Sequence, residues 1–161
     1  MKNKHHIQDV KVRLDFVNFD ARQLDALAGL QPLVKKSITP ALDVFYAKAK
    51  ATPETARLFA DDAHIAHAKS RQSTHWETIT SASFDEEYVA NVKAIGRTHA
   101  RLGLEPRWYI GGYALIIEQL FNTVLREELS GLLQAKKAER LSTKLAAIMK
   151  AAMVDMDYSI S

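Results

Sequence analysis

Residues 84–120, FDEEYVANVKAIGRTHARLGLEPRWYIGGYALIIEQL, contain the pattern that decides the fold. The pattern predicts two helices joined at a sharp corner. Asp85 can cap the first helix, and Gly103 can end it in a left-handed turn. Pro106 favours the start of the second helix, because a first-turn residue needs no N–H donor. The first helix has one apolar face that also carries His99, and the apolar residues recur at helical spacing: Val89, Val92, Ile95 and Leu102.

His99 lies on that apolar face one turn before its helix ends. A single histidine in such a place is more often a core residue whose ring is hydrogen-bonded to a carbonyl. The other candidate partner is iron, for which a neutral imidazole is a common ligand. The helical pattern by itself leaves both interpretations open.

Composition narrows the classes of protein that the chain can belong to. Its 161 residues, 47% of them hydrophobic, are enough for one domain that encloses a cofactor. The net charge of +3 is spread along the chain, so we expect no nucleic-acid partner. The absence of cysteine excludes disulfides and thiolate metal sites. No signal peptide or membrane-length apolar run is present, so we expect a cytoplasmic protein without membrane contact.

Helices are also expected before residue 84. Asp20 can cap a helix that ends near Gly29, and the next helix runs from about Pro32 to Ala51 with Pro40 inside it. Asp61 or Asp62 can cap a further helix that reaches about Thr80. The N-terminal segment, residues 1–19, alternates apolar and charged residues, and we interpret it as a short helix or an extended arm that packs three residues on the domain: Leu14, Phe16 and Phe19.

Two long helices are expected at the end of the chain. Residues 107–129 are apolar over much of the helix circumference, and residues 135–157 form the last helix. Both are longer than the core of one small domain requires. A homodimer through these two helices, within residues 107–157, would bury the surplus in a four-helix arrangement. The alternative is that the surplus apolar surface meets the N-terminal arm.

The string HARLGLEPRWYIGGY, residues 99–113, resembles the stretch around the haem-binding histidine of globin-coupled sensors. These are bacterial and archaeal globins that switch an attached output domain. The histidine, the LGLEP corner, the pair Trp108–Tyr109 and the step Gly111–Gly112 follow the order of that family. The resemblance extends upstream through FDEEYVANVKAIG and, more loosely, over nearly the whole chain. It implies an all-α, globin-like helical sandwich with an extra N-terminal segment and a shortened region before the distal helix, forming a single sensor domain over residues 1–161.

The resemblance also implies a cofactor, haem b (iron protoporphyrin IX), with His99 as the axial ligand of the iron. Phe45–Tyr46 in the segment ALDVFYAK looks like the family's distal Phe-Tyr pair. A tyrosine hydroxyl suits oxygen, because the bound gas carries partial negative charge. The alternative for Tyr46 is a boundary residue whose hydroxyl meets water. The other residues expected around the haem are Phe59, Ile65, Ala68, Arg71, Val92, Ile95, Trp108, Tyr109 and Tyr113.

Some of these positions have alternatives or depart from the family pattern. Ala68 replaces a larger aliphatic residue, and Arg71 stands where a small hydroxyl residue is frequent, so Arg71 can instead extend to solvent. Tyr109 could follow movement of the iron and His99, or be a buried tyrosine bonded to backbone. Three histidines share one helix without completing a metal site, and we expect a solvated face there, although the first two could reach a haem propionate or the iron: His64, His67 and His75.

The function implied by the resemblance is a haem-based oxygen sensor, not an enzyme. Oxygen, and also CO or NO, would bind opposite His99, and the change would pass to the dimer interface. The chain stops at Ser161, so it is either the sensor module of a longer protein or a single-domain member. A kinase, a diguanylate cyclase or a chemotaxis transducer would each fit as the output domain. The alternatives are a haem enzyme that removes NO or peroxide, and a haem-free helical dimerisation module in which His99 is structural.

Overall fold

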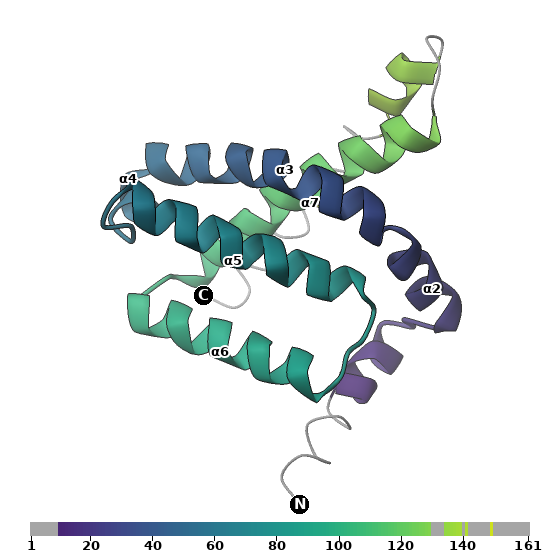
Figure 1. Cartoon of the computed structure of the whole chain (residues 1–161), viewed down its shortest axis with the longest axis horizontal. Coiled ribbons are helices and arrows are strands. Elements are labelled where there is room, and N and C mark those ends of the chain that lie inside the picture. Colours follow the sequence, from purple (N-terminus) through teal and green to yellow (C-terminus); the bar gives the residue numbers. More distant parts are fainter. Residues whose placement is uncertain (1–9, 130–133, 140, 142–148, 150–161) are drawn as a thin grey trace, which may run out of the picture.

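The structure, a computed structural model, describes residues 10–129, 134–139, 141 and 149. All of the regular elements in this part of the chain are helices, which confirms the all-α prediction. In Figure 1, α3, α5 and α6 lie one beside another, and α7 crosses behind them. The helices are α2 (Ala21–Gly29), α3 (Gln31–Ala51), α4 (Pro53–Ala56), α5 (Asp62–Thr80), α6 (Glu86–Leu102) and α7 (Pro106–Glu128).

Three aspartates cap the helices for which they were predicted. Asp20 accepts a hydrogen bond from the backbone N–H of Gln23 at 2.9 Å. Asp61 accepts one from His64 at 2.7 Å, and Asp85 accepts one from Tyr88 at 2.9 Å. Each carboxylate satisfies a donor that the first turn of its helix leaves unpaired. The sequence predictions of these three helix starts are confirmed.

The corner between α6 and α7 is the glycine turn expected from the sequence. Gly103 has a φ of 68°, the left-handed conformation that a residue with a Cβ adopts only at a cost. The backbone N–H of Leu104 donates to the carbonyl of His99 at 3.0 Å, which closes the end of α6. Pro106 then opens α7. The turn therefore fixes where the last turn of α6, with His99, lies relative to the start of α7.

Helix α3 is the centre of the core, since it packs closely along both α5 and α7. Pro40 lies within α3 without ending it. Helix α6 has no comparably close backbone packing with any other helix in the described part of the chain. The core cluster takes its fully or nearly buried residues from α3, α5 and α7: Val34, Ile38, Leu42, Tyr46, Trp76 and Ile116.

The N-terminal segment differs in part from the prediction. Residues 10–16 are helical, and Phe19 meets Phe84 with ring centroids 6.0 Å apart. Phe16, however, is 86% exposed, so the prediction that it packs on the domain is wrong. In a helix, residues two apart point to different sides, so Val10 and Leu14 are half-buried while Val12 and Phe16 face outward.

The predicted last helix, residues 135–157, lies mostly outside the described residues. After residue 129 the structure describes residues 134–139, 141 and 149, which are helical.

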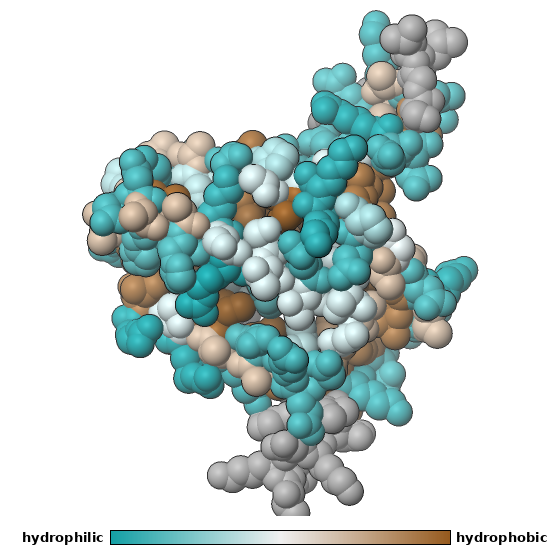
Figure 2. Space-filling model, viewed as in Figure 1, coloured by the Kyte–Doolittle hydropathy of each residue, from teal (hydrophilic) through white to brown (hydrophobic). Residues whose placement is uncertain are grey.

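On the face drawn in Figure 2, hydrophilic residues cover most of the surface, and hydrophobic atoms show as separate small groups. None of the described helices combines the length and the apolar character needed to cross a membrane.

Candidate functional site

His99 lies on the last turns of α6 and faces α7. Its ring centroid is 5.2 Å from that of Tyr109, in an edge-to-face contact. The side chain is half-buried, and burial lowers the pKa of the imidazole below its ordinary value. His99 is therefore neutral at pH 7, which is the form that binds a metal. Within the described residues no group hydrogen-bonds either ring nitrogen, so the bond to a carbonyl that a core histidine would make is not seen.

A chain of aromatic contacts leads from His99 into the core. The Tyr109 hydroxyl donates a hydrogen bond to the Tyr113 hydroxyl at 3.3 Å. The Tyr113 ring lies 5.6 Å from Trp76, which is 7% exposed and belongs to the core cluster. Burial, with the neighbouring Tyr109, raises the pKa of Tyr113. These aromatic contacts therefore connect α6 to α5 through α7.

Tyr46 occupies an aromatic cage on α3. It is 7% exposed, and its ring lies 4.8 Å from Phe45 and 5.8 Å from Phe59. Burial raises the pKa of the phenol to about 12, so the hydroxyl stays protonated and able to donate. No described residue hydrogen-bonds this hydroxyl. Among the described residues the hydroxyl is therefore free to donate a hydrogen bond to a small polar ligand.

The other predicted haem residues fall into four groups. Five pack against the core that contains Tyr46: Phe45, Phe59, Ile65, Ala68 and Tyr113. Val92 and Ile95 are half-buried on α6, outside that core. Arg71 is exposed, in line with the alternative that it extends to solvent. Trp108 is half-buried, and its indole N–H is fully buried and has no hydrogen-bond partner in the described part of the chain.

The histidines of α5 do not form a metal site. The Nδ1 atom of His64 accepts a hydrogen bond from the backbone N–H of Ala60 at 3.3 Å, and its ring contacts Phe59. His67 is exposed, while His75 is half-buried, and burial lowers its pKa. Across the described residues, no three His, Cys, Asp or Glu side chains are grouped so as to hold a metal ion.

Trp76 is the residue of this region that the predicted site did not include. It lies on the same face of α5 as Ile65 and Ala68, so its inward position follows from helical spacing. Its contact with Tyr113 does not follow from spacing, because that contact depends on how α5 and α7 pack. Trp76 is thus the point at which the aromatic chain from His99 enters the core around Tyr46.

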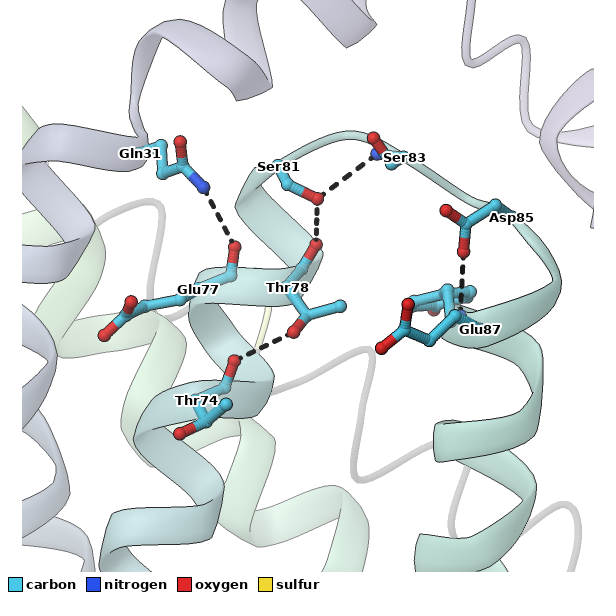
Figure 3. Close-up of a pocket in the computed structure, with 9 residues that line it drawn as sticks. Gln31, Thr74, Glu77, Thr78, Ser81, Ser83, Asp85 and Glu87 are labelled. Atoms are coloured by element: carbon cyan, nitrogen blue, oxygen red, sulfur yellow. Dashed lines mark hydrogen bonds between the residues drawn. The ribbon is translucent and has the colours of Figure 1, made fainter.

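A polar pocket of about 360 Å³ lies between the end of α5 and the start of α6. Figure 3 shows Gln31 donating to the carbonyl of Glu77, and the Ser81 hydroxyl donating to the carbonyl of Thr78. The pocket contains none of the predicted haem residues. Its polar groups close the ends of helices, so we assign it a structural role.

The residues of the candidate site fit a haem. A neutral imidazole is available on α6, apolar and aromatic side chains line α3, α5 and α7, and the Tyr46 hydroxyl has no hydrogen bond to a described residue. Among the described residues the buried indole N–H of Trp108 also lacks a partner, and a haem carboxylate is one group that could accept a hydrogen bond from it. These donors and surfaces match the needs of an iron porphyrin: one nitrogen ligand, an apolar enclosure and polar groups on its edges.

An all-α sandwich with such a histidine and a buried tyrosine defines a globin-like protein. The comparisons with known proteins agree, since residues 7–161 match the sequence profile of the protoglobin family. The chain belongs to the protoglobin family. It is also 30% identical over 106 residues, 65% of the chain, to the "Heme-based aerotactic transducer HemAT" of Halobacterium salinarum. The match spans 22% of that relative's length. No solved structure matches the chain.

The family assignment confirms the resemblance on which the sequence interpretation depended. Both the globin-like fold and the relation to globin sensors were predicted from residues 84–120 and from the segment around Tyr46. The name of that relative is that of a haem-based aerotactic transducer.

Proposed function

We propose that this chain is a haem-based gas-sensor domain in which His99 is the axial ligand of haem b. The observation that carries the proposal is the state of His99: a neutral, half-buried imidazole with no hydrogen bond to a described residue, on a helix without close backbone packing against the other described helices. When bound, the haem iron supplies the position that takes the gas. The match to a protein named for its haem supports the choice of cofactor.

Oxygen is the gas that the chain's own residues favour. Tyr46 is a buried residue whose hydroxyl stays protonated and whose ring contacts two phenylalanines, Phe45 and Phe59. It can donate a hydrogen bond to a ligand that carries partial negative charge, and it need not first give up a bond to another described residue. Carbon monoxide is much less polar, so it would gain little from the same donor.

The signal would leave the domain through α7. Tyr109 contacts His99 and lies on α7, so a movement of His99 reaches that helix directly. Many apolar side chains of α7 are only half-buried, which favours a homodimer that includes this helix. We propose a signalling output domain as the next partner, by analogy with the relative named as a transducer. A cytoplasmic location fits a chain without cysteine.

The test is the rate of oxygen release from the haem-loaded chain, measured by stopped-flow absorption for the wild type and Tyr46→Phe. We expect release to be roughly tenfold faster in Tyr46→Phe, the effect of losing about 1.4 kcal/mol of hydrogen bonding. Tyr88→Phe is the matched control, because burial also raises the pKa of Tyr88, which is half-buried and lies on α6 beside Phe84. Equal release rates in all three proteins would remove Tyr46 from the proposed role.

A further inference from the structure

Gly112 lies where α7 packs against α3. It is buried, and a Cβ atom added to it would lie 2.9 Å from Cε2 and 3.5 Å from Cζ of Phe45. Carbon atoms in favourable contact are about 3.5–4.0 Å apart. The edge of the Phe45 ring therefore occupies the space that a side chain would need at position 112.

The neighbouring glycine has no such contact. Gly111 is exposed, and a Cβ atom there would have no neighbour within 4 Å. Both glycines lie inside α7, where each costs about 1 kcal/mol relative to alanine. Only Gly112 has a packing reason for that cost. The two positions are a matched pair that differs in the contact with Phe45.

Phe45 connects this contact to Tyr46. The two rings meet edge to face with centroids 4.8 Å apart, and Tyr46 is enclosed on another side by Phe59. A side chain at position 112 would have to displace the Phe45 ring by about half an ångström to reach ordinary contact. Protein interiors are closely packed, so a displaced ring moves the neighbour that it touches.

We infer that Gly112 is a positioning residue for the gas pocket, the proposed gas-binding space at the Tyr46 hydroxyl. Gly112 seats the ring of Phe45, and through that ring it sets where the Tyr46 hydroxyl lies. The steric link follows from the packing of α3 against α7, while its effect on oxygen release rests on the proposed function. The link gives α7 a second connection to the pocket, separate from the contact between Tyr109 and His99. A movement of His99 would thus reach α7 through Tyr109, and a shift of α7 along α3 would in turn move the Tyr46 hydroxyl.

The test compares Gly112→Ala with Gly111→Ala in the full, haem-loaded chain labelled with fluorotyrosine. The fluorine resonance of Tyr46 is the one missing from Tyr46→Phe, and it is read in the diamagnetic carbon monoxide complex. We expect Gly112→Ala to shift this resonance and to speed oxygen release roughly two- to tenfold, as for one weakened hydrogen bond. Gly111→Ala should leave both unchanged, although it gains the same helix propensity.

A second substitution tests whether the effect passes through the Phe45 ring. Phe45→Leu removes Cε2 and Cζ, the two ring atoms nearest to a Cβ at position 112. We therefore expect Gly112→Ala to have no further effect on the Tyr46 resonance when Phe45→Leu is already present. Circular dichroism of each variant checks that the helices are intact.

Two results would overturn the inference: a Tyr46 resonance that moves equally in both glycine variants, or one that moves in neither. A resonance that moves only in Gly112→Ala, with oxygen release unchanged, would support the steric link and count against the proposed role of Tyr46. If the chain took up no haem, the same resonance would be read in the haem-free chain. The inference and the proposed function can therefore fail separately.

Discussion

The Tyr109 hydroxyl donates a hydrogen bond to the Tyr113 hydroxyl, 3.3 Å away and one turn further along α7. The two rings face different parts of the molecule, Tyr109 toward His99 on α6 and Tyr113 toward Trp76 on α5. Residues four apart lie on the same side of a helix, so the two tyrosines contact each other and together connect α6 with α5. This pair is the most direct described connection between His99 and the core.

Tyr109→Phe and Tyr113→Phe each remove this hydrogen bond. We expect each to lower the free energy of unfolding by about 0.5–1.5 kcal/mol, with the larger cost for Tyr113, which is more buried. Because both substitutions break one shared bond, the double variant should lose less than the sum of the two. Urea denaturation of the four proteins measures the coupling, and strictly additive losses would contradict the bond.

The raised pKa of Tyr46 predicts a dependence of stability on alkaline pH. The phenol titrates at about 12 in the folded chain and at 10.0 as an ordinary tyrosine. Below pH 10 its contribution to stability is complete, and it is lost as the pH rises toward 12, because only the unfolded chain releases the proton there. Wild type should therefore lose stability more steeply than Tyr46→Phe between these pH values. Denaturation at several pH values gives both slopes, and parallel slopes would argue against a buried phenol.

Gly96 inside α6 and Gly103 in the turn just after it predict opposite effects of alanine. Gly103 has a φ of 68°, so Gly103→Ala should destabilise the fold by about 1–2 kcal/mol. Gly96 lies inside the helix with nothing within 4 Å of an added Cβ, so Gly96→Ala should stabilise it by up to about 1 kcal/mol. Thermal unfolding followed by circular dichroism compares the two. A neutral Gly103→Ala would mean that the corner after His99 is not a left-handed turn.

Local signals made most of the fold predictable. Asp20, Asp61 and Asp85 begin helices because their carboxylates meet backbone donors only a few residues away. Gly103 ends a helix for an equally local reason, its freedom to adopt positive φ. The relation to globin sensors was predicted from residues 99–113, because several residues of this string occur in the same order in that family.

The parts that could not be predicted depend on packing between helices. Phe16 was expected to pack on the domain but is exposed, since alternating apolar residues do not share one helical face. The contact of Gly112 with Phe45 joins residues on two helices, and the sequence indicates only that some close approach offsets the cost of a helical glycine. The contact between Trp76 and Tyr113 has the same origin, because it depends on the crossing of α5 and α7.

The most direct test of the central claim is the absorption spectrum of the ferrous, haem-loaded chain with and without oxygen, for wild type, His99→Ala and His75→Ala. His75 is a suitable control, because burial lowers the pKa of both histidines but His75 lies on α5. The account predicts a stable oxygen-bound spectrum in wild type and His75→Ala and its loss in His99→Ala. Haem uptake and oxygen binding that are indifferent to His99, or no uptake by the wild type, would contradict it.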